Sequence, residues 1–412
     1  YPSISTSLIF SELINADFLS FGKIRLNYAE VGNDAPVYSL SSTYQQGTNW
    51  GDLPLYSVNA TQQNPDLKPE NTKSYEAGLE MYFFERRVGF DLAFYQNNTF
   101  NQIMPVNVTD ATGVQSKYVN GGELQNTGIE LNLTGTPVKS DNFSWRINLN
   151  WAQNENEVVK LAKGVENYLL YSNWGISVNA TEGSPYGTFR GTDYVYTNGK
   201  RTVNPIGSGL AGRFQQSEEK VIGHIQPDWN SGLSNTFTYK NLSLNVLLDM
   251  QQGGDIYSIS TQYGRATGLY EETAGTNQRG GLIRDPLDQN GGYLYANTVY
   301  PDGSANTSYI ETTGFTGAFW YRYIPHSHYL YDASYLKLRE VSLSYMLPQK
   351  IINKTPFSNV KVAVVGHNLA ILDSNTPFFD PEAITSSGNL QGIENASYPM
   401  TSTITFNLTV GF

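Results

Sequence analysis

Cysteine is absent from this 412-residue sequence, which excludes disulfides, thiolate metal sites and cysteine nucleophiles. Charged residues make up only 15 %, and the formal net charge of −11 leaves no basic stripe that could pair with nucleic-acid phosphates. Long apolar runs are missing too, and the mean hydropathy is −0.38, so a helical membrane span is excluded. A membrane barrel is not excluded, because each of its strands needs only ~9–11 alternating residues.

Aromatic residues and glycine are abundant, with 29 Tyr and 38 Gly, a composition that favours strands and turns. The final segment, TSTITFNLTVGF, places Ile404, Phe406, Leu408, Val410 and Phe412 on one face and small polar residues on the other. KIRLNY (23–28), GIELNL (128–133), WRINLNW (145–151), LSLNVLLDM (242–250) and VSLSYML (341–347) alternate in the same way. The sequence therefore predicts an all-β protein, although a soluble sandwich would alternate as well.

Two tryptophans favour a lipid-facing surface. Trp145 and Trp151 bracket Ile147 and Leu149 on one face, six residues apart, or ~20 Å of strand at ~3.3 Å per residue. This spacing resembles two aromatic girdles around a lipid-facing band. The alternative is a pair of buried tryptophans inside a sandwich.

Connections alternate between short and long. The short ones are FERR (84–87), TPVKSDN (136–142), YKN (239–241) and LPQKIINKTPF (347–357), and the long ones are 32–70, 159–183, 252–331 and 373–397. Transmembrane β-barrels have short periplasmic turns and long extracellular loops. The pattern therefore predicts a transmembrane antiparallel β-barrel, with residues 1–412 as part of one barrel domain and Phe412 at the periplasmic rim.

Thirteen strands are expected, at 3–10, 21–31, 71–84, 87–100, 121–135, 142–157, 184–196, 211–223, 228–239, 241–252, 332–347, 357–371 and 398–412. The strand at 211–223 is inferred because 184–196 and 228–239 would otherwise run in the same direction. Bacterial single-chain barrels close with an even number of strands. We therefore expect the sequence to be the back portion of a larger barrel.

Several motifs occur in an order that identifies a family. They are NPDLKPE (64–70), NTGIE (126–130), IGHIQPDWNSGL (222–233), DASYLKLREVSLSYMLP (332–348), Asn368-Leu369, Asp380-Pro381-Glu382 and Tyr398-Pro399. Together with the terminal Phe they resemble the C-terminal barrel of TonB-dependent outer-membrane transporters, in the SusC/RagA-like branch of the Bacteroidota. The resemblance covers essentially the whole chain. It implies a barrel of about 22 strands, with the plug domain and the TonB box outside this segment.

The resemblance also implies a function and a set of partners. The function is TonB-dependent import of oligosaccharides or peptides across the outer membrane, with no enzymatic activity. The implied partners are TonB, a SusD-like surface lipoprotein that contacts 252–331, outer-membrane lipid, and the barrel-assembly machinery. That machinery would read Phe406, Leu408, Val410 and Phe412 as an assembly signal. A passive porin and a structural barrel subunit of an envelope complex remain alternatives, as does a soluble all-β binding module.

Candidate binding residues are aromatic side chains in the long loops, because an aromatic face can stack on sugar rings or peptide side chains. These are Trp50, Tyr56, Trp174, Trp320, Tyr321 and Tyr323; loop packing or contact with a partner protein is the alternative for each. We expect Asp380, Pro381 and Glu382 to fix a turn. His326 and His328 lack a third ligand at metal spacing and are expected at the surface, so no metal and no cofactor are predicted.

Overall fold

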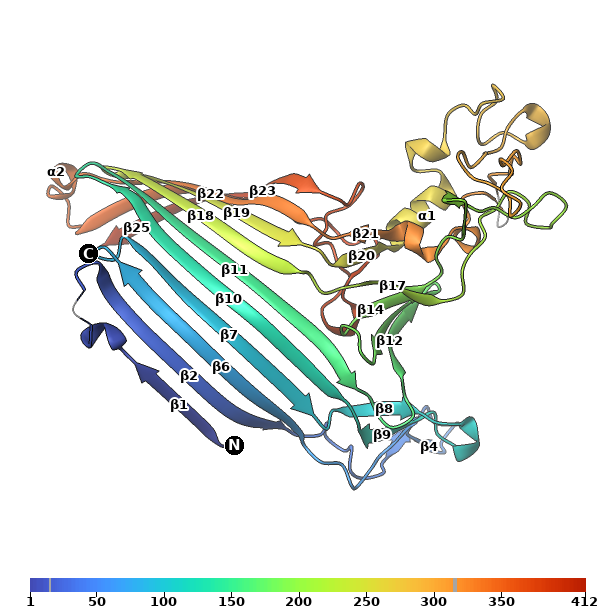
Figure 1. Ribbon diagram of the computed structural model, residues 1–412, viewed down its shortest axis with the longest axis horizontal. Helices are drawn as coiled ribbons and strands as arrows, with labels where there is room; N and C mark the ends of the chain where they lie inside the picture. The colour runs from blue at the N-terminus through green and yellow to red at the C-terminus, as the bar shows by residue number, and fades with distance from the viewer. Residues whose placement is uncertain (15, 314–316) are drawn as a thin grey trace.

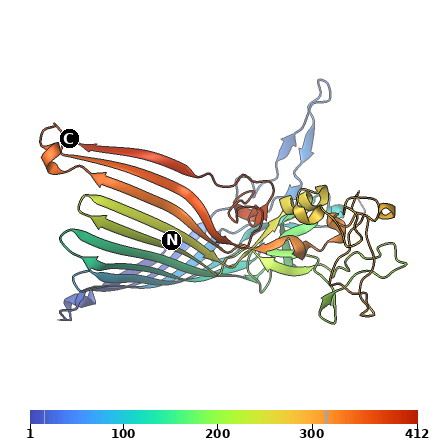
Figure 2. The same cartoon turned by 90° about the horizontal axis from the view of Figure 1, so that it is seen from above.

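A computed structural model describes residues 1–14, 16–313 and 317–412. Its main element is an 11-stranded antiparallel sheet, curved like a trough and open along its first and last strands (Figures 1 and 2). In sheet order the strands are β1 (Ser3–Leu8), β2 (Leu19–Asn33), β6 (Glu70–Phe83), β7 (Val88–Phe100), β10 (Glu123–Lys139), β11 (Phe143–Lys160), β18 (Trp229–Tyr239), β19 (Leu242–Gln252), β22 (Tyr335–Met346), β23 (Asn359–Ser374) and β25 (Thr403–Gly411).

The register of the sheet sorts side chains onto two faces. Leu149 of β11 lies opposite Leu133 of β10 and Leu233 of β18, while the next residue, Asn150, lies opposite Asn132 and Gly232. The apolar face is uncovered: Phe406, for example, is 78 % exposed. No second sheet therefore packs on this face within the described residues, which is the arrangement expected of a barrel wall and not of a sandwich.

Asn235 is a polar residue on the apolar face, opposite Ile147. Its side-chain oxygen accepts a hydrogen bond from the indole nitrogen of Trp145 at 3.1 Å. The indole N–H of Trp145 and the amide oxygen of Asn235 thereby satisfy each other without water, which lowers the cost of placing them in an apolar environment.

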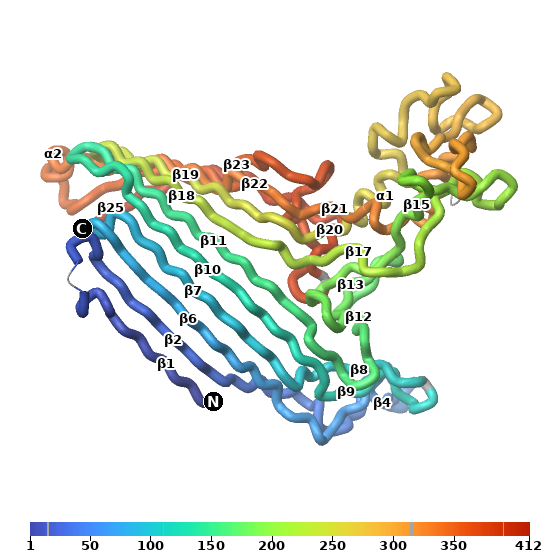
Figure 3. The backbone as a smooth tube through the Cα atoms, in the orientation of Figure 1, coloured from blue at the N-terminus to red at the C-terminus, as the bar shows by residue number. Residues whose placement is uncertain are grey.

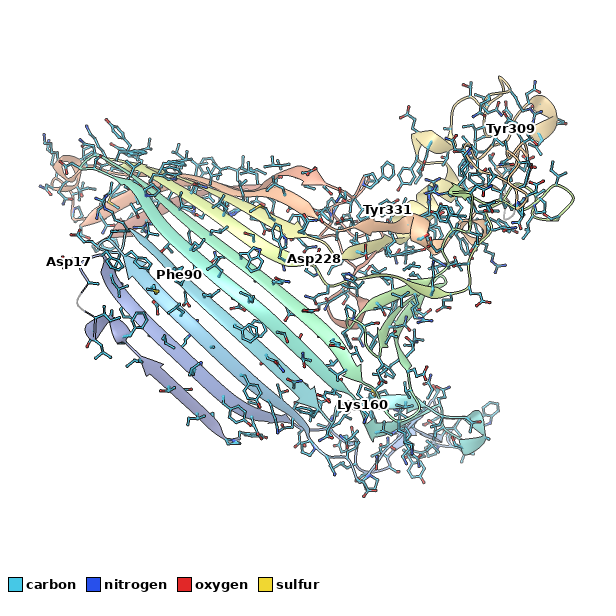
Figure 4. The ribbon with its side chains drawn as sticks, in the orientation of Figure 1. Asp17, Phe90, Lys160, Asp228, Tyr309 and Tyr331 are labelled. Carbon is cyan, nitrogen blue, oxygen red and sulfur yellow. The ribbon has the colours of Figure 1, made fainter. Side chains whose placement is uncertain are left out.

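Connections differ in length at the two ends of the sheet, as Figure 3 shows. One end, here called the turn end, has the segments 9–18, 84–87, 140–142, 240–241 and 347–358. The other, the outer end, has 34–69, 101–122, 161–228, 253–334 and 375–402. In Figure 4 Asp17 lies at the turn end, and Lys160 lies where β11 leaves the sheet at the outer end.

The expected count of thirteen wall strands is wrong, because eleven strands form the described sheet. The segments 184–196 and 211–223 lie outside it and contribute short strands, chiefly β14 (Thr188–Gly191) and β17 (Lys220–His224), to a separate sheet. The wall strands still alternate in direction without these two segments, because β11 and β18 pair directly as antiparallel neighbours. The connection 101–122 is a further outer connection, which the expected set of long connections did not include.

Three outer connections fold together into a compact unit, called here the outer domain: 161–228, 253–334 and 375–402. Its sheets combine β12 (Asn167–Asn173), β13 (Ile176–Thr181), β14 and β17, and β21 (Leu330–Asp332), β20 (Asp255–Ser258) and β24 (Ile393–Glu394). Its core includes Val178, Phe189, Tyr257, Tyr329 and Ile393, each at most 1 % exposed. All three connections contribute to this core, so they form a folded domain and not independent loops.

A second core lies in the distal lobe of the outer domain, where Figure 4 labels Tyr309. Its members are Tyr194, Val203, Phe214, Tyr295, Tyr300, Ile310 and Ala318. The lobe contains β15 (Tyr196–Thr197) and β16 (Lys200–Arg201), and helix α1 (Ile259–Thr267) joins it to β20.

The remaining strands lie in the first two outer connections. They are the hairpin β3 (Tyr44–Gln46) and β4 (Tyr56–Val58), and the small sheet of β5 (Thr61–Gln62), β9 (Ser116–Asn120) and β8 (Ile103–Asn107). Helix α2 (Gln349–Ile352) lies in a turn-end connection. Among the described helices, none has the length and apolar character needed to cross a membrane.

Short 3-10 turns complete the described secondary structure. They are Phe10–Glu12, Asp110–Thr112, Glu271–Thr273, Leu287–Gln289, Tyr321–Tyr323, His326–Tyr329 and Gly388–Leu390.

Candidate functional site

The polar face of the sheet carries charged side chains that form ion pairs across neighbouring strands. Arg25 of β2 reaches across β6 to Asp91 of β7, with Nη1 2.7 Å from Oδ1, and its Nε lies 3.2 Å from Glu76 Oε1. One row away, Lys23 Nζ lies 3.2 Å from Glu80 Oε2. These two cations and three carboxylates leave the wall at this point polar, with one net negative charge.

Gly78 allows this arrangement, because a β-carbon at that position would lie 2.3 Å from Arg25 Nε. We expect Gly78→Ala to displace the guanidinium from Asp91 and Glu76 and to lower the free energy of unfolding by about 1–3 kcal/mol. Gly232→Ala is the matched control: it is a glycine of β18 on the same polar face, with no atom within 4 Å of its added carbon. Urea unfolding in detergent measures both; equal midpoints for the two variants would contradict this role of Gly78.

Two adjoining hollows lie on the polar face. One, of about 500 Å³, is lined by Arg25, Asp91, Glu130, Asn132, Asn150 and Asp249 among others. The other, of about 570 Å³, includes Ser74, Tyr95, Asn97, Asn126 and Asn154. Amide, hydroxyl and carboxylate groups therefore line this face, a surface suited to a hydrated interior.

A charged cluster ties the connection 375–402 to the wall, and we call it the latch. Lys337 of β22 contacts Asp380 Oδ1 and Glu382 Oε2, both at 2.5 Å, and the side chains of Lys337 and Asp380 are each only 6 % exposed. Arg339 donates from Nη2 to Glu382 Oε1 at 2.9 Å and also pairs with Asp249. The latch joins two wall strands to the outer domain.

The predicted turn at Asp380-Pro381-Glu382 is present, since the backbone N–H of Glu382 donates to Asp380 Oδ1 at 3.0 Å. The same carboxylates bind Lys337 and Arg339, a role that the sequence interpretation did not assign. Burial is the largest influence on the pKa of Asp380 and raises it, but the hydrogen bonds from Lys337 and from the backbone N–H of Glu382, together with the charge of Lys337, leave the pKa below its ordinary value. The available signal was the spacing: Lys337 and Arg339 are two residues apart in a strand, and so share a face.

The predicted aromatic residues fall into separate groups. Trp174 meets the ring edges of Tyr263 and Tyr321 at 5.3 and 5.6 Å, and Trp320 lies 4.7 Å from Tyr321. Tyr323 lies beneath the guanidinium of Arg213 at 4.9 Å.

Trp50 and Tyr56 lie apart from this group, on the hairpin β3–β4 that projects from the outer end in Figure 2, and are 78 % and 64 % exposed. The structure therefore gathers Trp174, Trp320 and Tyr321 but not all six. A binding role for each remains a prediction.

The histidines were expected at the surface, and this was wrong. His326 Nδ1 accepts from the backbone N–H of Thr192 at 3.0 Å, and His328 Nδ1 lies 2.6 Å from the Tyr194 hydroxyl. Both rings lie largely inside the outer domain because the short 3-10 turn 326–329 folds them toward β14 and its neighbours. Among the described residues, no three metal-ligating side chains gather into one group.

Because His328 is buried, we expect the outer domain to lose stability in acid. Burial, reinforced by the charges of Arg265 and Arg201, lowers its pKa to about 3, so the folded state keeps the ring neutral. Stability is complete above the pKa of ~6.5 of an unfolded histidine and falls by up to about 1.4 kcal/mol per pH unit from there toward pH ~3. Hydrogen exchange of 326–334, corrected for intrinsic rates, measures this; an unchanged pH slope in His328→Gln would refute it.

The two girdle tryptophans occupy opposite ends of the apolar band. Trp145 stacks on Phe237 with ring centroids 5.7 Å apart, near the turn end. Beyond Trp151 the same face of β11 continues with Gln153 and Glu155. The change from aromatic to polar residues fits a membrane boundary at Trp151, and the girdle role of both residues remains a prediction.

The proposed assembly-signal residues lie on the edge strand. Phe406 and Leu408 are 78 % and 68 % exposed, and Phe412, at 91 %, lies at the turn end with its ring 5.4 Å from Phe357. Their recognition by the assembly machinery remains a prediction.

Comparison with known proteins decides the family. The family model described as "TonB dependent receptor-like, beta-barrel" matches residues 5–247, more than half of the chain. The chain belongs to this family. TonB-dependent receptor P3 of Formosa agariphila is 26 % identical over 97 % of this chain and 40 % of the receptor. TonB-dependent receptor SusC of Bacteroides thetaiotaomicron is 24 % identical over 71 % of this chain and 32 % of SusC.

Solved structures show the same fold. The RagAB peptide transporter aligns with a TM-score of 0.74 and 21 % identity, covering all of this chain and 43 % of that one. This TonB-dependent receptor barrel is thus SusC/RagA-like, as its motifs indicated, and is an outer-membrane protein and not an enzyme. It spans less than half the length of the relatives it matches.

Proposed function

We propose that this chain forms the C-terminal wall of an active importer, which takes oligosaccharides or peptides across the outer membrane with energy supplied through TonB. The observation that carries the proposal is the two-faced wall of a TonB-dependent receptor family member: an exposed apolar face and a continuous hydrogen-bonding face. The relatives support it, since one is named SusC and another is described as a peptide transporter.

The outer domain is the part of the chain suited to capture and to partner binding. We propose that a SusD-like surface lipoprotein sits on it, with residues within 252–331 among its contacts. In this region Leu269 is 79 % exposed and Leu282 is 51 % exposed, although leucine usually lies inside. Trp174, Trp320 and Tyr321 would contact the ligand or the partner.

Energy dependence tests the import proposal. Uptake of a labelled oligosaccharide or peptide pool is compared in cells with and without TonB, each expressing the complete transporter. Import that requires TonB supports the proposal. Uptake that persists at the same rate without TonB would instead identify a passive porin, and no uptake with an intact barrel would favour a structural role.

The partner contact is tested by surface substitution, because deleting 252–331 would remove part of the core of the outer domain. Leu269→Asp with Leu282→Asp is expected to weaken co-purification of the lipoprotein. Gln45→Asp, on the separate hairpin β3–β4, is the control because it adds a charge at another exposed outer position. Undiminished co-purification of the Leu269/Leu282 variant would place the partner elsewhere.

A further inference from the structure

Charge is distributed unevenly between the two ends of the wall. The five outer connections contain 12 Lys and Arg against 21 Asp and Glu. Three adjacent turns, 140–142 together with the preceding strand residue Lys139, 240–241 and 347–358, have the opposite character. They contain Lys139, Lys240, Lys350 and Lys354, with Asp141 as their single carboxylate. We call these four residues the turn-end lysines.

Hydrogen bonds between the turns hold them together at one rim. The backbone N–H of Lys240 donates to Asn142 O at 2.8 Å, joining the first two turns. The backbone N–H of Met346 donates to Asn241 O at 2.9 Å, and the Asn241 side chain donates back to Met346 O at 2.9 Å, joining the third. The turn-end lysines therefore lie along one continuous stretch of the rim, at the left in Figure 1.

All four lysines are exposed and make no ion pair within the described part of the chain. Four cations of the wall differ, since Lys23, Arg25, Lys337 and Arg339 all meet carboxylates. Lys240 Nζ lies over the ring of its neighbour Tyr239, 5.5 Å from the ring centroid. Their charge is thus available to an external anion.

Apolar side chains surround the turn-end lysines and continue the lipid-facing surface. Tyr239, Leu242 and Tyr345 are cross-strand neighbours on the apolar face and are 55 %, 41 % and 40 % exposed. In the third turn Ile351 is 53 % exposed beside Lys350. Aromatic and basic side chains together at the end of a membrane-spanning surface are typical of the headgroup region.

We propose that the turn-end lysines bind the phosphate groups of anionic phospholipid in the periplasmic leaflet. Lipid, and not an acidic protein, is favoured because the exposed apolar residues make the rim continuous with the lipid-facing surface. Each lysine near an anionic surface contributes a favourable attraction that falls off within a Debye length. The site would anchor this side of the wall at a fixed depth, independently of what the protein imports.

Trp145 provides a reporter, because it lies opposite Val138, next to Lys139, on the apolar face. The complete transporter is placed in phosphatidylcholine nanodiscs that contain a minor fraction of brominated phosphatidylglycerol or brominated phosphatidylcholine. The quenching specific to Trp145 is the difference from Trp145→Phe. We expect phosphatidylglycerol to be preferred over phosphatidylcholine on the order of fivefold in the unmodified protein. The preference should be smaller in 0.5 M salt, where the Debye length shortens to ~4 Å and the attraction is screened.

Replacing all four turn-end lysines by glutamine should bring that preference to about one. The matched control replaces Lys68, Lys117, Lys163 and Lys200, four lysines of the outer connections, and should retain the preference. Both variants change only partly or fully exposed side chains, and circular dichroism confirms that they fold. Equal quenching by both lipids in the unmodified protein overturns the proposal. This result is expected if the lysines bind an acidic protein and not lipid. Equal loss in both variants also overturns it.

Discussion

Replacing Lys337 by methionine is expected to release the connection 375–402 from the wall. Methionine keeps most of the volume but leaves the carboxylates of Asp380 and Glu382 without the ammonium group that contacts both at 2.5 Å. Removing one partner of a buried ion pair costs about 3–5 kcal/mol, because the other charge stays desolvated. Each ~1.4 kcal/mol lost raises the population of the open state about tenfold. Hydrogen exchange of 378–396 in nanodiscs should therefore accelerate by about two or more orders of magnitude.

The control for this experiment is Lys361→Met. Lys361 lies on the polar face of β23, is exposed, and makes no ion pair among the described residues. A triple variant, Lys337→Met with Asp380→Asn and Glu382→Gln, removes the uncompensated charges and should recover part of the protection. If Lys337→Met and Lys361→Met exchanged alike, the latch would not hold the connection in place.

An arginine at position 246 is expected to destabilise the wall far more than one at position 245. Val246 lies on the apolar face in the row of Ile147 and Asn235, between the levels of Trp145 and Trp151. Arginine on the lipid face near the bilayer midplane costs about 2–4 kcal/mol. The side chain of Asn245 is on the polar face beside Ser342 and Thr236, where a charged group can remain hydrated.

Urea unfolding of both variants in lipid vesicles measures this difference. Val246→Arg should unfold at clearly lower urea than the unmodified protein, and Asn245→Arg should change the free energy of unfolding by less than about 1 kcal/mol. The reverse order, or equal losses, would mean that the faces are assigned wrongly.

Much of the wall could be predicted from sequence, because a strand with lipid on one face and water on the other alternates apolar and polar residues. Ile147, Leu149 and Trp151 alternate with Asn148 and Asn150, and the structure places these groups on opposite faces. The period of two fixes which residues share a face, and the short turns fix which strands are neighbours. Neither inference needs information from distant parts of the chain.

The outer domain could not be predicted in this way. Its core joins Val178, Tyr257 and Ile393, which belong to three separate connections. The sequence around each residue does not show that the three side chains meet. The stretch 184–196 was expected as a wall strand, but its strand β14 lies between β13 and β17 of another sheet. Alternation predicts a strand and does not say which sheet the strand joins.

The latch falls between these cases. Lys337 and Arg339 stood out within a motif, and Asp380 and Glu382 within another, yet the sequence does not show that the two motifs meet. Their contact depends on the path of the chain between β23 and β25, which carries the carboxylates back against β22. A charged pair on each side, both with spacing two, is the signal that could have suggested it.

The central claim is that the apolar face of the wall meets lipid and the polar face meets water. Nitroxide labels placed one at a time at Ser243, Leu244, Asn245 and Val246 of the reconstituted transporter test it most directly, by their collision rates with oxygen and with a polar nickel complex. The collision rates are expected to alternate, with oxygen favoured at positions 244 and 246 and the nickel complex favoured at positions 243 and 245. Uniform accessibility along β19, or oxygen preference at 243 and 245, would contradict it.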